Sequence, residues 1–329
     1  MNRRHLTFGL HAFAIALALP LFSTSAAAAD NFPSKPITMV VGFAPGGATD
    51  TAARIIAKKL SENLGQSVLV DNRAGAGGNI AHLQVSLAAA DGYTILLGSV
   101  GPLTIAPHLV AKLGYDPQRD LAPLTMGVSF PNVLVVHSGV PAKNFAEFVA
   151  LAKQKPGTLD YASTGVGSAS HLAGELLKQR AGIDIVHVPY KGGGPAMIDL
   201  LAGRITGYFS TPSTAGPHIA SGQLRAIAST GLMRAPGLPD VPTIAESGFP
   251  GFDASNWYAF VAPGKTPTAL LDRWNKELVK VLSAPDVREQ LLKHGLTPAP
   301  GTREELAKTI REQSITWARV IKQGNITAD

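Results

Sequence analysis

The stretch PITMVVGFAPGGATDTAARIIAKKLSENLGQSVLVDN, residues 36–72, decides the fold. It opens with a short run typical of a β-strand and turns through GGATD. Small or apolar residues then recur at 52, 53, 56, 57 and 60, which is the spacing of one helix face. Gly65 follows as a helix C-cap would, and SVLVDN predicts a second strand. The stretch therefore predicts a strand, a glycine turn, a helix and a strand.

The alternation continues through the rest of the chain. A glycine-rich loop (NRAGAGGNI), a helix (IAHLQVSLAAA) and a strand (YTILLGS) complete β-α-β-α-β, and the same pattern resumes after residue 130. This favours an α/β fold of two lobes, each a mainly parallel sheet flanked by helices. The tail begins with the strand WYAFVAP and ends in three helical stretches, the last opened by a capping box of Thr302 and Glu305.

A tail with one strand has little sheet of its own to cover, so we assign it to the first lobe. We expect residues 30–130 plus 255–329 to form lobe 1 and residues 131–254 to form lobe 2. The chain then crosses between the lobes near Phe130 and again near Ser255.

Residues 1–29 have the pattern of an export signal. Arg3 and Arg4 precede an apolar run, and small residues end it, which predicts cleavage near Ala27 or Ala29 and a periplasmic mature protein. A membrane anchor is the alternative, but the run is shorter than a membrane span requires. The arginine pair leaves open whether the general secretory or the twin-arginine route is used. The chain has no cysteine, so it needs no disulfide in an oxidising compartment.

The charge balance gives little evidence of a macromolecular partner. The formal net charge is +6, and loss of Arg3 and Arg4 with the signal lowers it to +4. Basic and acidic residues are interspersed, without the basic stripe expected of a nucleic-acid-binding protein. We therefore predict no nucleic-acid partner.

Two glycine turns, one in each lobe, have similar surroundings in the sequence. FAPGGATD and ASTGVGS each follow a strand and precede a helix. Such turns lie at the carboxyl ends of strands, where open α/β sheets place ligands. Glycine admits a ligand close to the backbone, and a helix start offers free N–H groups with a positive dipole end. Facing turns of this kind predict a cleft for a small carboxylate.

Other interpretations of these turns remain open. A nucleotide-binding Walker loop needs a Gly-Lys-Ser/Thr sequence, whereas Gly47 is followed by Ala48 and Thr49. GAGGN at 75–79 does not complete a dinucleotide fingerprint. The turns could also be plain connections in which Thr49 or Asp50, and Ser168, are helix N-caps.

Catalytic and metal-binding patterns are weak. There is no G-x-S-x-G elbow, and Ser168 with His171 three residues later is more typical of a helix cap than of a nucleophile and base. His171 and Glu175 have the spacing of two metal ligands, but no third ligand is indicated. We predict no catalytic residue, no metal and no cofactor.

Several segments resemble the extracytoplasmic receptors of tripartite tricarboxylate transporters, the Bug receptor family. They include FPSKPITMVVGFAPGGATDTAARIIAKKL, GQSVLVDNRAGAGGNIA, LDYASTGVGSASHLAGELL, HVPYKGGGPAMIDLLAGRI and WYAFVAPGKTP, in the family's order from about residue 32. The resemblance implies a monomeric periplasmic binding protein and not an enzyme. It further implies two lobes closing over a small organic acid, and delivery to a permease of one large and one small transmembrane subunit.

The resemblance also implies a set of ligand-binding residues. These are the residues of this chain that match the family's first ligand loop, its second ligand loop and the segment that borders the cleft. They are Phe43, Ala44, Pro45, Gly46, Gly47, Asp50, Ser163, Thr164, Gly165, Gly167, Ser168, His171, Tyr190 and Lys191. Family pattern and chain differ at Phe32, Gly42 and Ala74, none of which is a proposed donor. A periplasmic sensor-partner protein and, less favoured, a periplasmic hydrolase remain alternative functions.

Within that set we expect a division of roles. The N–H groups at Gly46 and Gly47 would hold one carboxylate, and the Ser163, Thr164 and Ser168 region the other. Asp50 would repel an anion, so we expect it to cap the helix and orient the loop. Phe43 and Tyr190 would wall the cleft or lie in the core, and Lys191 would face the cleft or solvent.

Overall fold

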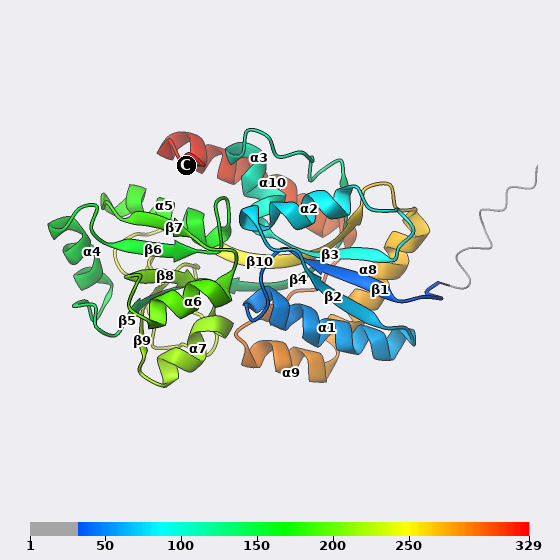
Figure 1. Ribbon diagram of the computed structural model, residues 1–329, viewed down its shortest axis with the longest axis horizontal. Coiled ribbons are helices and arrows are strands. Elements are labelled where there is room, and N and C mark those ends of the chain that lie inside the picture. Colours follow the sequence, from blue (N-terminus) through cyan, green and yellow to red (C-terminus); the bar gives the residue numbers. More distant parts are fainter. Residues whose placement is uncertain (1–31, 329) are drawn as a thin grey trace, which may run out of the picture. The chain divides into compact units, whose positions relative to one another are not determined.

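Strand β1 (Ile37–Val41) lies between β2 (Val68–Asn72) and β3 (Thr94–Ser99), and both pairs are parallel. Four of its five residues are buried, as expected for a parallel strand covered by helices on both faces. The computed structural model describes residues 32–328, and those from Pro33 onward belong to one compact unit. Figure 1 shows this unit with its helices and strands labelled.

Helix α1 (Ala48–Leu64) forms as the sequence predicts. Its buried residues include Ala52, Ala53, Ile56, Ala57 and Leu60, the face expected from their spacing. The helix ends at Gly65, which has the left-handed φ of 66° that glycine tolerates, and its N–H bonds the Ser61 carbonyl.

The first sheet has six strands in the order β11-β4-β10-β3-β1-β2. β4 (Leu121–Pro131), β10 (Ser255–Pro263) and β11 (Thr297–Pro298) add antiparallel pairs to the parallel part. Between β1 and β4 lie the remaining helical segments of this part of the chain: η1 (Ala76–Gly78), α2 (Asn79–Ser86), the π-helix η2 (Gly101–Ile105) and α3 (Ala106–Leu109).

The second sheet has five strands in the order β7-β6-β8-β5-β9. They are β5 (Val133–His137), β6 (Asp160–Ser163), β7 (Val186–Pro189), β8 (Gly207–Ser210) and β9 (Leu224–Ser229). Its helices are α4 (Phe145–Gln154), α5 (Ala169–Ala181), α6 (Gly193–Leu201) and α7 (Pro212–Ala220). β6 pairs in parallel with β7 and β8, while β5 pairs antiparallel with β8 and β9.

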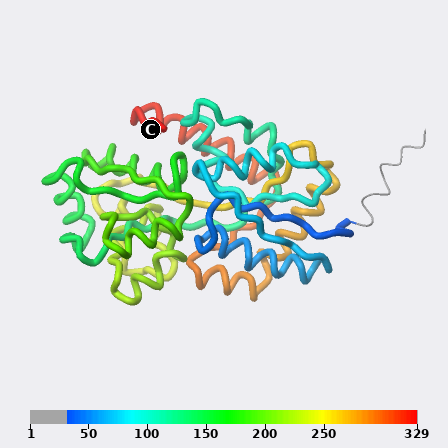
Figure 2. Tube along the Cα trace, in the orientation of Figure 1, coloured from blue at the N-terminus to red at the C-terminus, as the bar shows by residue number. Residues whose placement is uncertain are grey.

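The α/β fold with two sheets is confirmed, and both sheets are mixed in direction. The antiparallel pairs arise where the chain passes between the sheets. β4 leads directly through Asn132 into β5, and β10 returns alongside β4 in the opposite direction. Figure 2 lets the reader follow these two passages along the chain. The assignment of residues 30–130 plus 255–329 to one lobe and 131–254 to the other stays a prediction.

The C-terminal tail contains the three helices that the sequence predicts. They are α8 (Thr268–Ser283), α9 (Pro285–Lys293) and α10 (Arg303–Gly324), and the capping box of Thr302 and Glu305 is confirmed at the start of α10. α10 contributes to two hydrophobic cores. Leu306 and Ile310 join the core of the first sheet, and Trp317 and Ile321 join that of the second.

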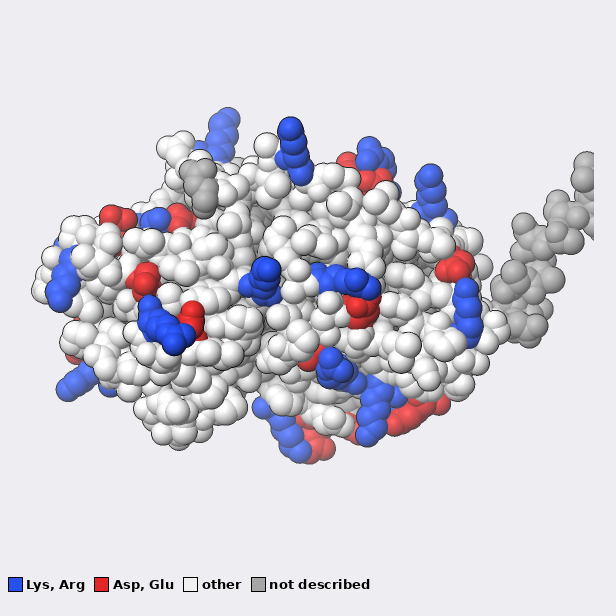
Figure 3. Space-filling view, in the orientation of Figure 1, with Lys and Arg blue, Asp and Glu red and all other residues white. Residues whose placement is uncertain are grey.

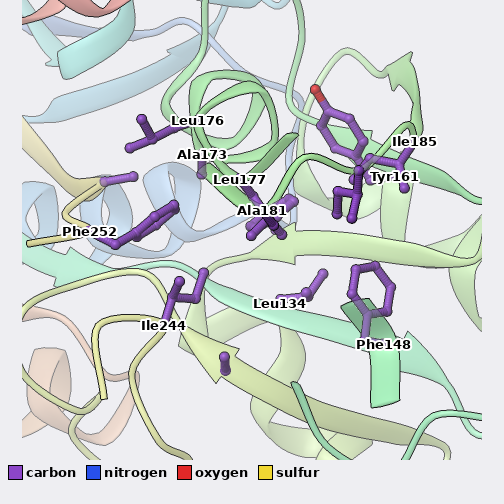
Figure 4. Close-up of a cluster of buried hydrophobic side chains, with 14 of the residues drawn as sticks. Leu134, Phe148, Tyr161, Ala173, Leu176, Leu177, Ala181, Ile185, Ile244 and Phe252 are labelled. Atoms are coloured by element: carbon purple, nitrogen blue, oxygen red, sulfur yellow. The ribbon is translucent and has the colours of Figure 1, made fainter. Parts of the chain in front are cut away.

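The core on one face of the second sheet packs aromatic and aliphatic side chains from the strands and the helices that cover them. Figure 4 shows Leu134, Phe148, Tyr161 and Phe252 in this cluster, with Leu177 from α5. All five are fully buried. This rigid packing fixes the strand ends that carry the site described below.

Candidate ligand-binding site

A cavity lies where the two sheets meet, and both contribute to its wall. The empty space among its residues, including the part open to solvent, is about 440 Å³. The lining consists of Phe43, Gly47, Ala48, Thr49, Ser99, Asn132, Thr164, Ser168, Ala169, Ser170, Gly193, Tyr208, Phe209, Thr211, Thr214, Asn256 and Tyr258.

Four helices begin at this cavity. α1 and α5 present Gly47 and Ser168, their N-cap residues, and α6 presents its first residue, Gly193. α7 presents its N-cap, Thr211. The first N–H groups of a helix have no partner within the helix, and the helix dipole is positive at this end. The four starts therefore make the cavity favourable for an anion.

None of the described residues lining the cavity is Lys, Arg, His, Asp or Glu. An anion bound here would be held by backbone N–H groups, hydroxyls and amides, without a charged side chain opposite it. Figure 3 shows that Lys and Arg alternate with Asp and Glu over the face in view, as on a solvated surface. The attraction for an anion thus comes from oriented dipoles within the cavity.

Four polar side chains of the cavity have a buried atom that finds no hydrogen-bond partner in the described part of the chain. They are the Oγ of Ser99, the Nδ2 of Asn132, the hydroxyl of Tyr208 and the Oδ1 of Asn256. Burial raises the pKa of Tyr208, and the nearby Ser210 side chain lowers it by a smaller amount, but the two hydroxyls do not have the geometry of a hydrogen bond. Buried polar atoms are normally satisfied, so an unsatisfied set lining one cavity indicates a bound polar partner.

The first predicted loop contributes Phe43 and Gly47 to the cavity. The expected ligand residues Ala44, Pro45 and Gly46 border a separate, mainly apolar groove beside α6 and α7. Their role in ligand binding stays a prediction.

Asp50 lies beneath this loop and orients it. Its carboxylate accepts the N–H of Gly46 at 3.1 Å, the Nε of Arg54 at 3.0 Å and the Nδ2 of Asn72 at 3.1 Å. Burial opposes ionisation of this carboxyl, but the bonds from Arg54, Gly46 and Asn72 outweigh burial and lower its pKa. Asp50 is therefore a buried carboxylate that fixes the position of Gly46.

The N-cap of α1 differs from the expectation. The helix begins at Ala48 with Gly47 as N-cap, so neither Thr49 nor Asp50 is the cap residue. Glycine is acceptable at this position because the first N–H groups can bond elsewhere. In the second turn the expected cap is confirmed, since the Ser168 side chain accepts the N–H of His171.

The second predicted loop divides into residues that line the cavity and residues that support the loop from behind. Thr164 and Ser168 line the cavity, while Ser163 and His171 lie behind the loop. Ser163 Oγ accepts the N–H of Gly165 at 3.0 Å, and His171 Nδ1 accepts the N–H of Gly167 at 3.2 Å. These two bonds set the path of the chain between the cavity-lining hydroxyls.

Two histidines stack behind this loop. The rings of His171 and His187 lie 4.0 Å apart, and His187 Nε2 lies 2.6 Å from Ser163 Oγ. Burial lowers the pKa of His171 to about 4 and that of His187 to about 3, so both are neutral at pH 7. Ser163 is fully buried, and Ser168 Oγ receives the N–H of His171 and does not donate to its ring. Neither serine is arranged as an accessible nucleophile with a base.

The predicted border segment lies outside the cavity. Tyr190 donates its hydroxyl proton to Asp199 at 2.7 Å, and burial with this bond raises the pKa of Tyr190 to about 12. Lys191 is exposed, but its carbonyl oxygen accepts the N–H of Ala44 at 3.1 Å. This segment contacts the first loop through its backbone.

Several cavity residues were not predicted from the sequence. Thr211 and Thr214 follow a strand and begin a helix, the same signal that identified the other two turns. Asn132, Asn256 and Tyr258 lie on or beside the crossing strands, and no local pattern distinguishes them. Within residues 32–328 no group of three or more His, Cys, Asp or Glu could hold a metal ion, and no helix is long and apolar enough to cross a membrane.

Comparison with known proteins identifies the family. The model of the tripartite tricarboxylate transporter family receptor matches residues 52–326. The chain belongs to this family. It is 41% identical over 316 residues to a protein from the tcbD-tcbE intergenic region of Pseudomonas sp. strain P51, covering 96% of this chain and 94% of that one. It is 38% identical to the protein BugT of Bordetella pertussis, covering 90% and 91%.

Solved structures agree with this assignment. The periplasmic binding protein BugD superposes with a TM-score of 0.87 at 35% identity, covering 90% of this chain and 99% of that one. A Rhodopseudomonas palustris protein with adipate also superposes with a TM-score of 0.87 at 35% identity, covering 90% of this chain and 99% of that one. MatC of that organism, with bound malate, gives a TM-score of 0.84 at 33% identity, covering 88% and 100%. The chain is thus a solute-binding protein of the Bug type, and the predicted two-lobed binding-protein fold is confirmed.

Proposed function

We propose that this protein is a periplasmic receptor that captures a small organic acid and delivers it to a tripartite tricarboxylate-type permease. The observation that carries the proposal is the cavity with four helix N-termini and no charged side chain among its described lining residues. Such a site neutralises a carboxylate through N–H groups and hydroxyls. Two structural relatives hold small dicarboxylates, adipate and malate, which supports this ligand class.

The arrangement of donors suits capture followed by release. Donors come from both sheets, so a ligand with two or more carboxylates would bridge them. Because no side chain of opposite charge is among the described lining residues, separation of the two halves would break only dipolar contacts to the ligand. Delivery to a permease with one large and one small transmembrane subunit, and a monomeric state, are part of the proposal; membership of the receptor family supports the permease partner.

Calorimetry with a panel of di- and tricarboxylates tests the capture step. We expect one ligand per chain, and we expect Gly47→Val to abolish binding because the valine methyl groups would enter the cavity. The Cβ itself meets nothing closer than 3.6 Å, so the fold should persist. Gly216→Ala is the matched control, since Gly216 has open space around its Cβ position and does not line the cavity.

Cell fractionation and transport assays test location and delivery. We expect the mature chain, lacking residues 1–29, in the periplasmic fraction, and carboxylate uptake that requires both the receptor and a permease. A folded sample that binds no carboxylate would refute the capture proposal. Carboxylate binding that drives a signalling ectodomain without any permease-dependent uptake would favour a sensor role.

A further inference from the structure

Two asparagines occupy the places where the chain passes between the sheets. Asn132 separates β4 from β5, and Asn256 is the second residue of β10, opposite Phe130 of β4. The Asn132 main chain is held by Thr230, whose Oγ1 accepts its N–H at 3.0 Å and whose N–H bonds its carbonyl at 2.9 Å. Both side chains are therefore carried by firmly hydrogen-bonded backbone, and both line the cavity.

The two amides bond to each other and leave one acceptor and one donor unused. Asn256 Nδ2 donates to Asn132 Oδ1 at 3.3 Å, while Asn256 Oδ1 and Asn132 Nδ2 have no hydrogen-bond partner within residues 32–328. Asn132 is fully buried and Asn256 is 8% exposed. Reversing both amides would exchange the two residues' roles and again leave one acceptor and one donor.

The unused carbonyl oxygen constrains the ligand. Carboxylate oxygens only accept hydrogen bonds, so a simple dicarboxylate satisfies the N–H groups and hydroxyls but leaves the amide oxygen unpaired. A ligand hydroxyl supplies the donor that this oxygen lacks, and a ligand oxygen can accept from the Asn132 amide N–H. A ligand ammonium could also donate, but four positive helix ends and the lack of Asp or Glu among the described lining residues disfavour a cation.

We propose that the Asn132–Asn256 pair selects organic acids that carry a hydroxyl group over the same acids without one. This inference rests on the proposed carboxylate-binding function and names the ligand class of that site. A ligand that leaves a buried neutral group without its hydrogen bond binds roughly 5- to 150-fold more weakly. The wild-type protein should therefore prefer the hydroxylated member of a matched pair by a factor in this range.

Calorimetry on the mature protein with matched ligands tests the inference. The pairs are malate against succinate and citrate against tricarballylate, each differing by one hydroxyl at a constant number of carboxylates. Aspartate tests the ammonium alternative. We expect malate or citrate to bind at least fivefold more tightly than its partner, and aspartate to bind more weakly than malate.

The double variant Asn132→Leu/Asn256→Leu removes both amides, so no unpaired partner remains. We expect the affinity ratio within each pair to fall to about one. Ser99→Ala is the control. It removes a different unpartnered group of the cavity, the Ser99 hydroxyl, and should weaken the binding of both acids of a pair alike.

Each outcome is decisive for the inference. Equal affinities within both pairs for the wild-type protein would overturn it while leaving carboxylate binding intact, and this arm does not depend on the variant folding. A hydroxyl preference that survives the double variant would also overturn it, as would aspartate binding as tightly as malate. Absence of binding by every acid would overturn the proposed function, and the inference with it.

Discussion

The backbone N–H of Ala44 donates a hydrogen bond of 3.1 Å to the carbonyl oxygen of Lys191, joining a loop of the first sheet to a turn of the second. The contact is close because Gly192 has no side chain, since a Cβ there would lie 3.0 Å from the Ala44 nitrogen. The two sides of the cavity thus meet backbone to backbone at its edge, and glycine makes this approach possible.

Gly101, at a second meeting point of the two sides, should control ligand affinity although it does not line the cavity. A Cβ on Gly101 would lie 2.5 Å from the Gly167 carbonyl oxygen and 3.1 Å from Ser168 Cα. We expect Gly101→Ala to hold the two sides apart and to weaken ligand binding at least tenfold in calorimetry. The free energy of unfolding without ligand should change by less than about 1 kcal/mol, because the clash is relieved by separation.

The control for Gly101→Ala is Gly216→Ala, whose new methyl group enters open space. It should leave the affinity unchanged. The same affinity for Gly101→Ala and wild type would show that this approach is not required for binding. The glycine-rich segment at 75–79 belongs to the same contact, since a Cβ on Gly165 would lie 2.8 Å from Gly77.

Asp50 should support both stability and ligand binding. Asp50→Ala removes the acceptor for Gly46, Arg54 and Asn72, so we expect a loss of about 1–3 kcal/mol in unfolding free energy and weaker ligand binding. Because the pKa of Asp50 is lowered, its contribution is present at neutral pH and is lost as the pH falls from about 3.8 through its folded pKa.

Urea unfolding at several pH values, with calorimetry at pH 7, measures these effects. Arg54→Ala is the comparison, because it removes a half-exposed partner but keeps the Gly46 and Asn72 bonds. We expect it to cost less than about 1 kcal/mol. An Asp50→Ala protein no less stable than Arg54→Ala would contradict the role assigned to the carboxylate.

The buried histidines should make the fold less stable in mild acid. The pKa of His171 is about 4 in the folded chain against an ordinary 6.5, so the unfolded chain binds its proton first as the pH falls. Stability therefore decreases below pH 6.5, by about 2 kcal/mol at pH 5 for this group. The groups around it are His187, Tyr161, Glu175 and Lys178.

Two substitutions separate the proton effect from the loop effect. His171→Asn keeps an acceptor near the Gly167 N–H, whereas His171→Phe removes it. Both should reduce the stability loss between pH 7 and pH 5 by about 2 kcal/mol, as measured by urea unfolding. Only His171→Phe should weaken ligand binding at pH 7. Equal binding by both variants would refute the positioning role of His171.

The capping box of α10 should matter for stability alone. Thr302 accepts the N–H of Glu305, and the Glu305 carboxylate accepts the N–H of Thr302 at 2.8 Å. Thr302→Ala should lower the unfolding free energy by about 0.5–2 kcal/mol. The affinity for ligand should not change, because the box lies outside the cavity. A change in calorimetric affinity would mean that α10 affects the site.

Much of the fold was predictable where the signal is local. The strands around α1, its buried face and its C-cap at Gly65 follow from residue spacing, and the Ser168 cap follows from residue type. β4 was missed because Pro123, Gly127 and Pro131 give it the composition of a loop. Its register shifts against β10 show how such residues are accommodated in a strand that pairs on both sides.

The site was predictable only in part, because only some of its residues belong to a local sequence pattern. Phe43, Gly47, Thr164 and Ser168 belong to turns with a local pattern, and they line the cavity. Ser163, His171 and Asp50 belong to the same turns but point behind them, and a one-dimensional pattern does not separate the two directions.

By itself, the sequence determined the alternation of strands and helices, the glycine turns and the helix caps, because these depend on residues a few positions apart. Only the tertiary structure brought four helix starts to one cavity and paired Asn132 with Asn256 beside them. Those two asparagines are 124 residues apart, and sheet pairing across the whole chain decides that they meet.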